Sequence, residues 1–295
     1  MSTNQSAGAG WTAGTLPAAA QSRIQRFAQG GSVASSLSSY SEHVLLQDMG
    51  FEPISAVVGL SVVHLGQIQV AGLKQPVELE AYSNAISMGL LYALTRVQQE
   101  AHLLGADGVL LQSIDEKNFD GEEHLYSMQG TALRFTPHPG GLRTPTGAPF
   151  VCSSSVMTLY QMLRRSRVPV NVGYGVCVYH VPHRSLRQAL GQTFQNLEVP
   201  VFTDGWYTAR EIAMSRLEAQ LGQAGADTIM HAKIVEQEGA FGEHTAEFRA
   251  VGHGWRLMQG LANVIPDVDL SVASLIEQGS VHSATLVDHP AKPVR

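Results

Sequence analysis

The pattern of hydrophobic positions in this 295-residue chain predicts the same series of elements twice. In each half, an apolar strand precedes a long helix whose apolar side chains recur every three or four residues. The stripe of the first helix runs from Ile86 to Leu104, and that of the second begins at Trp206 and is interrupted by Arg210. With a short helix before them and two strands after them, each half is predicted to follow the order α-β-α-β-β.

Three short motifs indicate that the two halves are copies of one unit. They recur in the same order, and the distance between the members of a pair increases along the chain. This is expected where short insertions separate the elements of a duplicated unit. The pairs are Gly59–His64 with Gly175–His180, Gly105–Asp107 with Gly225–Asp227, and Gly130–Arg134 with Gly252–Arg256.

The ends of the expected helices carry local signals. Ser39 and Glu42 form a capping box before the first short helix, and Ser155 stands at the matching place in the second half. Gly105 and Gly225 follow the long helices, where glycine most easily adopts the left-handed conformation that ends a helix. We therefore expect each long helix to end at a glycine.

Other local signals mark where the long helices and the first strands begin. Ser83 and Thr203 are expected to cap the long helices, because a hydroxyl can accept a hydrogen bond from an N–H of the first turn. Pro53 and Pro169 are expected where the first strands start, because the missing N–H of proline is tolerated there. The strands are predicted at 54–65, 109–114 and 125–135, and at 170–181, 229–235 and 248–258.

Together these patterns predict an α+β fold. It consists of two tandem two-layer α/β units, each a small antiparallel sheet covered by one long helix. Stretches of low complexity, or rich in proline and glycine, mark the segments outside the units. The expected division is a flexible N-terminal arm at 1–37 with a short helix at 23–27, unit 1 at 38–136, a linker at 137–150, unit 2 at 151–260 and a C-terminal tail at 261–295 with a short helix at 272–278.

Composition argues against several classes of protein. The net charge is −6 and the lysines and arginines form no cluster, so nucleic-acid binding is not expected. No stretch approaches the ~20 apolar residues that span a bilayer, and the N-terminus does not resemble a signal peptide. Cys152 and Cys177 have no partner motif, which favours the reducing cytoplasm. Only 15% of the residues are charged, so we expect surface to be buried between the subunits of a homo-oligomer.

The repeated motifs resemble those of the YbjQ family, a group of small bacterial proteins labelled as heavy-metal-binding domains. The resemblance rests on a strand that ends in G-x-x-V-x-H, a long helix that closes in LGADGV, and a final strand with GTALR. It is looser in unit 2, where Thr228 replaces a glycine and His253 and Gly254 replace a Thr-Ala pair. The resemblance implies a two-layer α/β unit and a ring-like assembly, commonly a pentamer.

Histidines and acidic turns are the candidate metal ligands. His64 and His180 hold equivalent strand positions among apolar neighbours, and His124 and His244 follow the acidic turns. Paired imidazoles can bind a divalent transition metal. Alternatively, His64 and His180 are hydrogen-bonded in the core or at a subunit contact, which is the interpretation we favour. For the acidic residues we favour a solvated hairpin tip over a cation site.

Asp107 and Asp227 occupy the turn between a long helix and the next strand. An aspartate at such a place commonly accepts hydrogen bonds from nearby backbone, so we expect a structural role for both.

The chain lacks a catalytic motif. G-x-S-x-G, G-x-x-x-x-G-K-[ST] and H-E-x-x-H are all absent from the sequence. The leading hypothesis is a non-enzymatic protein that assembles into a ring through YbjQ-like units, with the N-terminal arm or the C-terminal tail available to a protein partner. The alternative is a metal-binding or metal-handling protein that uses the histidines and acidic turns. A third hypothesis is an enzyme with a cleft between the units, for which no nucleophile and base can be named.

Overall fold

The structure is a computed structural model, and it describes residues 14–31, 33–66, 75–118, 122–182, 200–238 and 245–268. These residues form helices and strands in comparable amounts, which confirms the predicted α+β class. The first half contains α1 (Ala18–Ala28), α2 (Tyr40–Asp48), β1 (Phe51–His64), β2 (Val77–Glu78), α3 (Glu80–Leu103), β3 (Gly108–Asn118) and β4 (Glu123–Phe135). The second half contains β5 (Phe150–Cys152), α4 (Val156–Leu163), β6 (Arg167–His180), α6 (Pro200–Gln223), β7 (Thr228–Glu238) and β8 (Thr245–Leu257), followed by a 3₁₀ turn at Leu261–Asn263.

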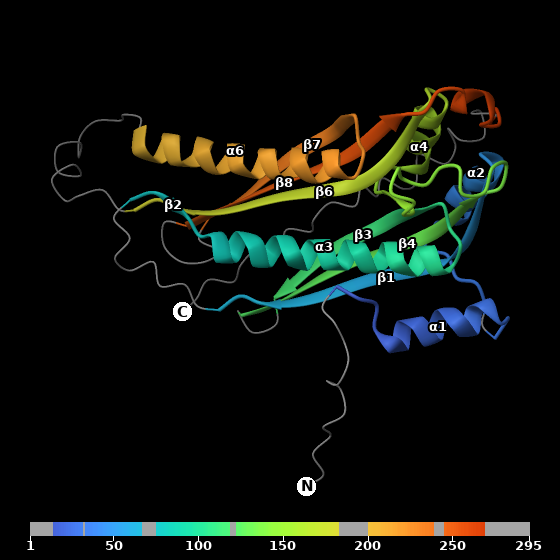
Figure 1. The fold of residues 1–295 in the computed structure, drawn as a ribbon, viewed down its shortest axis with the longest axis horizontal. Coiled ribbons are helices and arrows are strands. Elements are labelled where there is room, and N and C mark those ends of the chain that lie inside the picture. Colours follow the sequence, from blue (N-terminus) through green and yellow to red (C-terminus); the bar gives the residue numbers. More distant parts are fainter. Residues whose placement is uncertain are drawn as a thin grey trace, which may run out of the picture.

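Two four-stranded sheets repeat one design. Sheet A has the strand order β1-β4-β3-β5, and sheet B has the order β2-β6-β8-β7. The three long strands of each sheet are antiparallel, and the first of them has an irregular register just after its proline, Pro53 in β1 and Pro169 in β6. One long helix covers each sheet, α3 on sheet A and α6 on sheet B (Figure 1). Each unit therefore has the predicted two layers.

The long helices approach their own sheets at matched glycines of the repeated motif. A Cβ atom on Gly59 would lie 1.9 Å from the carbonyl oxygen of Ala93, and one on Gly175 would lie 1.8 Å from that of Ala213. Both obstructing atoms belong to the backbone, so a side chain could be accommodated only if the helix moved. Close contact between helix and strand thus explains why each copy of the motif begins with glycine.

Most of the predicted helix signals act as expected. Both hydrogen bonds of the capping box between Ser39 and Glu42 are present, and the Ser155 hydroxyl accepts the first-turn bond of α4. Gly105 and Gly225 end the long helices with φ angles of 71° and 92°.

The predicted caps of the long helices are wrong. Ser83 lies inside α3, and Leu79 occupies the N-cap position without a capping side chain. Thr203 likewise lies inside α6, which begins at Pro200. The hydroxyl of Ser83 has a different partner, in the other unit.

The two shortest strands each join the sheet of the other unit. β2 belongs to the first half of the chain but pairs with the edge of β6, at Val77 opposite His180 and Glu78 opposite Tyr179. β5 belongs to the second half but pairs in parallel with β3 of sheet A. Sheet A is therefore not purely antiparallel, and each sheet is completed by a strand from the other half.

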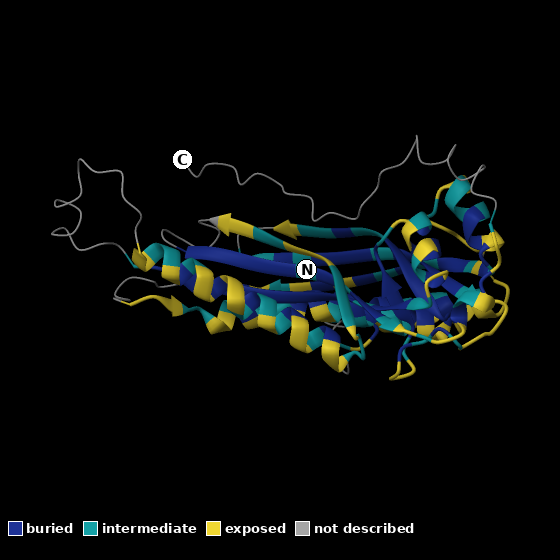
Figure 2. Cartoon of the chain, turned by 90° about the horizontal axis from the view of Figure 1, so that it is seen from above, coloured by how far each residue is buried: buried dark blue, intermediate teal, exposed yellow. Residues whose placement is uncertain are grey.

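The two halves also share one hydrophobic core. The face of sheet B that is turned away from α6 packs against α3 and against the α3-covered face of sheet A. This contact buries Val172, Val176 and Val178 of β6 together with Ile86 and Leu90 of α3. Figure 2 shows the central strands buried along most of their length, whereas each long helix exposes one side.

The expected arm, linker and tail are packed against the units where they are described. In the arm, α1 is longer than predicted and lies against α3, and Leu16 and Ile24 are buried. Leu142 of the expected linker is buried, as are Leu261 and Ile265 of the expected tail. A few well-placed apolar side chains hold these segments down, although their average composition is polar. The helix expected at 272–278 lies outside the described residues.

Candidate functional site: the contact between the two units

The backbone edge of β1 is closed by side chains from α3. Arg96 donates a hydrogen bond to the carbonyl oxygen of Leu60, and the Glu100 carboxylate accepts one from the N–H of Val58 at 2.9 Å. Unpaired N–H and carbonyl groups on an edge strand can recruit a strand from another molecule. The two helix residues therefore restrict strand pairing along this part of β1.

The same arrangement occurs on β6. Arg216 of α6 donates to the carbonyl oxygen of Val176 at 2.6 Å, and Gln220 accepts from the N–H of Tyr174 at 2.6 Å. These helix residues are equivalent by sequence to those of α3. Arg210, which interrupts the apolar stripe of α6, takes no part in these bonds.

Beyond this point the edge of β6 is covered by unit 1. β2 pairs with Tyr179 and His180, and the next residue, Leu79, donates its N–H to the carbonyl oxygen of Val178 at 2.8 Å. The Ser83 hydroxyl accepts a hydrogen bond from the N–H of Val178 at 2.9 Å. The side chain that was expected to cap α3 instead satisfies a backbone group of the other unit.

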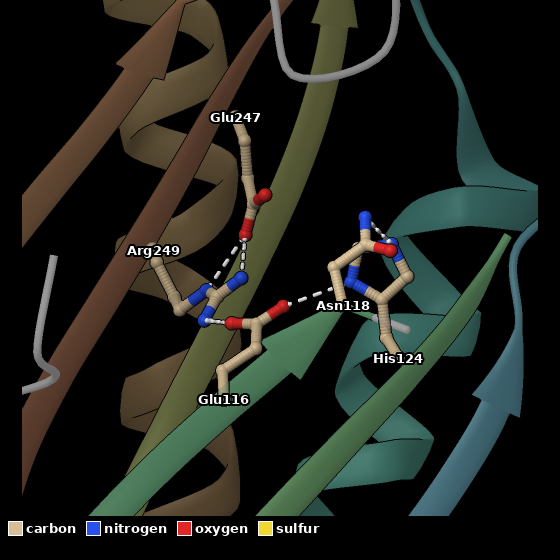
Figure 3. Close-up of polar contacts among 5 residues, drawn as sticks. All are labelled: Glu116, Asn118, His124, Glu247 and Arg249. Carbon is tan, nitrogen blue, oxygen red and sulfur yellow. Dashed lines mark hydrogen bonds and ion pairs between the residues drawn. The ribbon is translucent and has the colours of Figure 1, made fainter. Parts of the chain in front are cut away.

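A cluster of polar and charged side chains, centred on the buried Arg249 and Glu247, also connects the units (Figure 3). Arg249 of β8 donates to Glu116 of β3 at 2.6 Å and to Glu247 of its own strand at 2.6 Å. Nδ1 of His124 lies 3.1 Å from the second oxygen of Glu116, and Nε2 lies 3.3 Å from the amide nitrogen of Asn118. A single guanidinium thus holds carboxylates from both sheets.

The cluster is charged although it is buried. Burial alone would raise the pKa of Glu116, but the hydrogen bond with His124 and the charge of Arg249 outweigh it and lower the pKa to about 2. Burial would lower the pKa of Arg249, but the charges of Glu247 and Glu116 raise it above its usual value. Removing one member of such a buried group leaves the others uncompensated. The cluster therefore fixes β8 against β3. Glu116 is one of the acidic residues expected at a solvated hairpin tip, and its place in this cluster shows that the expectation was wrong for this residue.

A histidine occupies the opposite end of the contact. Nε2 of His253 lies 2.6 Å from the hydroxyl of Ser153, and Nδ1 lies 3.3 Å from that of Ser154. The ring of His231 stacks 5.7 Å away, centroid to centroid. Burial, and then the proximity of His231, lower the pKa of His253 to about 4. The imidazole is therefore neutral at physiological pH. Thr131 holds the matching position in unit 1 and accepts from the N–H of Leu37.

The structure separates the histidines that were candidate metal ligands. His180 is buried at the β2–β6 pair, His124 lies in the charged cluster, and His244 lies outside the described residues. The side chain of His64 is 60% exposed, with Nδ1 3.3 Å from a Glu123 oxygen and Nε2 3.9 Å from a Glu122 oxygen.

His64 is therefore not part of the core of its own chain, because no second unit covers this face of sheet A among the described residues. Its expected place at a subunit contact stays a prediction. Among the described residues, no group of three or more His, Cys, Asp and Glu side chains is placed to hold a metal ion. Metal binding stays a prediction.

Asp107 and Asp227 have matching structural roles. The carboxylate of Asp107 accepts from the N–H of Phe135 at 2.9 Å, and that of Asp227 accepts from the N–H of Leu257 at 2.7 Å. Their partners lie 28 and 30 residues later, at the ends of β4 and β8, and not in the adjacent turn. Each aspartate therefore ties a helix end to the last strand of its own sheet.

A cavity of about 670 Å³ lies between α1 and α3. Apolar and amide side chains line it, among them Leu16, Ile24 and Gln98, and its one titratable lining residue is His102. A single imidazole does not provide the nucleophile and base that covalent catalysis requires.

Comparison with known proteins assigns the chain to a family. Over 238 residues the chain is 35% identical to an encapsulin nanocompartment protein of Mycobacterium tuberculosis (strain ATCC 25618 / H37Rv), and the alignment covers 80% of this chain and 90% of that protein. The chain belongs to the family of this nanocompartment protein. No family model matches the chain, and no solved structure is similar to it. The YbjQ resemblance therefore stays a prediction.

Membership in the family of a nanocompartment protein agrees with the prediction of a non-enzymatic protein. In the described part of the chain, no helix combines the length and the apolar character needed to cross a membrane.

Proposed function

We propose that this protein is a structural component of a protein nanocompartment and assembles with copies of itself. The observation that carries the proposal is the 35% identity with an encapsulin nanocompartment protein over 90% of that relative. The contact between the units supports it physically. Strand exchange and a buried charged cluster already join two copies of one fold within the chain, and repeated units of this kind commonly stack through similar contacts.

The more detailed proposal is a ring of YbjQ-like units. Surfaces that meet head to tail give a closed ring when the rotation per contact closes, and an open filament when it does not. Each chain contributes two units, so a ring of whole chains has an even number of unit positions. A pentamer of the kind implied by the resemblance would therefore contain five chains and not five units.

We also place the protein in the cytoplasm. Cys152 and Cys177 are both free and buried. Burial raises the pKa of the Cys152 thiol to about 11 and that of the Cys177 thiol to about 12, so neither thiol forms the reactive thiolate readily. Unreactive, unpaired thiols are compatible with a reducing compartment.

Light scattering and electron microscopy of the purified full-length protein test this function. The expected result is a closed particle of defined size, many times heavier than the 31.7 kDa chain. A protein that stays monomeric at every micromolar concentration would contradict the proposal. Metal analysis of the same sample, before and after a chelator is added, tests the alternative of a metal-binding protein. Assembly that survives the chelator argues for a structural role without metal.

A further inference from the structure

Equivalent positions of β1 and β6 differ sharply in exposure. Val176 and Val178 of β6 are completely buried beneath unit 1, whereas their equivalents, Leu60 and Val62 of β1, are 48% and 59% exposed. The residues are apolar in both strands, so the difference comes from what covers them. We call the surface formed by Leu60, Val62 and His64 the open sheet face. It is the equivalent, in unit 1, of the face of sheet B that receives α3.

The two long helices differ in the complementary way. α3 is packed on two sides, because Ile86, Leu90 and Leu94 are buried along with the side that faces its own sheet. α6 fully buries only the side that faces its own sheet, and Trp206 and Met214 at the border of that side are partly buried against it. The residues of α6 that match the second packed side of α3 are partly or largely exposed, and we call this surface the open helix side. Its members are Thr203, Trp206, Arg210 and Met214.

The strands that follow the long helices also differ between the units, because β3 has a neighbour on each side and β7 has a neighbour on one side only. In sheet A, β3 lies between β4 and β5, and Asp107 at its start is fully buried. In sheet B, β7 is the last strand among the described residues, and the side chain of Asp227 at its start is 47% exposed. The stretch 34–36, which precedes Ser39 as β5 precedes Ser155, is exposed. Each chain thus exposes the open sheet face of unit 1 and the open helix side of unit 2. Their equivalents in the other unit are packed together inside the chain.

We propose that the open helix side of one chain packs on the open sheet face of a second copy of this chain. The contact between chains then repeats the contact between unit 1 and unit 2, so that units follow one another in a uniform series. The inference rests on the proposed self-assembly and adds the surfaces that carry it. A second copy is the fitting occupant because the chain already seats its own equivalent of that helix on its own equivalent of that face.

The internal contact specifies one interchain hydrogen bond. Ser83 of α3 accepts from the N–H of Val178 at 2.9 Å. Thr203 is equivalent to Ser83, and Val62 is equivalent to Val178. The hydroxyl of Thr203 in one chain therefore accepts from the N–H of Val62 in the next chain. Within one chain α6 and β1 are not neighbours, because sheet B and α3 lie between them (Figure 1).

Disulfide cross-linking tests the pairing directly. The full-length variant Val62→Cys with Thr203→Cys should give a ladder of linked chains on a non-reducing gel after mild oxidation. The matched control, Ser83→Cys with Val178→Cys, should form its disulfide within one chain and give no ladder. Each single variant of the test pair, with one exposed thiol per chain, can join at most two chains and should give no linked species. A linked dimer from Val62→Cys alone would overturn the proposal, because it would mean that like faces meet.

A charged substitution tests whether the open sheet face drives assembly. Val62→Glu should lower the assembled fraction at least about tenfold, as expected for a central interface residue, without changing the melting temperature of the chain. The matched control is Met88→Glu, because Met88 is 46% exposed on α3 and belongs to neither surface. This control should assemble like the wild type.

The outcomes distinguish this inference from the proposed function. A wild type that assembles, with Val62→Glu assembling equally well and no ladder from the double variant, overturns the pairing of surfaces and leaves the compartment function standing. A wild type that never assembles overturns both. If Val62→Glu fails to fold, the cysteine pair alone decides, because its substitutions carry no charge.

Discussion

In unit 2 the strand face around Val176 and Val178 lies beneath another unit, whereas the matching face of unit 1, around Leu60 and Val62, is open. The long helices show the reverse, since α3 is enclosed on two sides and α6 on one. Within each unit the contacts are nearly the same: the matched glycines, the helix residues that close the strand edge, and the aspartate that holds the last strand. The difference between the units therefore lies in their neighbours. A substitution that acts inside a unit should have similar effects in both, and one that acts on the contact should not.

The largest effect is expected at the charged cluster. Arg249→Met keeps most of the side-chain volume but removes the guanidinium that pairs with the buried Glu247 and the partly buried Glu116, which should lower the free energy of unfolding by about 3–5 kcal/mol. Chemical denaturation measures this loss. Glu52→Gln is the control, because Glu52 pairs with Arg134 at the surface, where a salt bridge contributes about 0–1 kcal/mol. Equal losses in the two variants would show that the cluster does not hold the units together.

The matched glycines should respond alike in the two units. Gly59→Ala and Gly175→Ala each place a methyl group against a helix carbonyl, so each should lower the free energy of unfolding by about 3 kcal/mol. Gly222→Ala is the control, because a Cβ there meets nothing within 4 Å and a helical alanine is favoured over glycine by up to about 1 kcal/mol. If only one of the two strand variants is destabilised, the units are less equivalent than their packing indicates.

A pH titration should reveal a difference between the units at His253. Its pKa is about 4 in the folded protein and 6.5 ordinarily, so the unfolded chain binds more protons between these values. Stability should therefore fall as the pH drops from 6.5 to 4, by an amount on the order of 2 kcal/mol. His253→Thr introduces the residue that unit 1 has at this place and should abolish this dependence. Glu116 acts at lower pH, because its pKa is lowered from 4.5 to about 2 and its contribution is lost in that range. An unchanged titration curve for His253→Thr would assign the effect to other groups.

The smallest effect concerns the two aspartates. Asp107→Ala leaves the buried N–H of Phe135 without an acceptor, which should lower the free energy of unfolding by about 1–3 kcal/mol. Asp227→Ala should lower it by about 1 kcal/mol or less, because water can reach the N–H of Leu257 and the lost ion pair with Arg167 is partly exposed. Both variants should be measured as unassembled protein. Equal losses of unfolding free energy in Asp107→Ala and Asp227→Ala would contradict the exposure of Asp227 at the start of β7.

Much of the fold follows from local signals in the sequence. The capping box of Ser39 and the glycines that end the long helices depend on residues that are close in sequence, and the structure contains them, together with the long strands that the apolar runs predict. Because the motifs repeat, each helix or strand predicted in one half of the chain is also predicted at the equivalent place in the other half. These signals were sufficient for the α+β class and for the long elements.

The contact between the units could not be predicted in the same way. β2 and β5 have two and three residues, too few to show a periodic pattern. Ser83 has the sequence context of a helix cap, and only the position of β6 reveals that it binds another strand. Arg249 and Glu116 lie 133 residues apart, and nothing near either of them signals that they meet. His64 and His180 have similar sequence surroundings but different burial, which depends on the neighbouring unit.

The exchange of β2 and β5 constrains the order in which the protein can form as it is synthesised. After β4 has emerged from the ribosome, sheet A still lacks its fourth strand, and β2 has no partner until the end of β6 appears. For this period the nascent chain carries unpaired strand edges, which are the groups most prone to pair with the wrong molecule. Neighbouring copies made on one messenger offer the same edges at the same moment. Association between copies and correct folding therefore compete for the same hydrogen-bonding groups, and the early closure of the β1 edge by Arg96 and Glu100 favours folding.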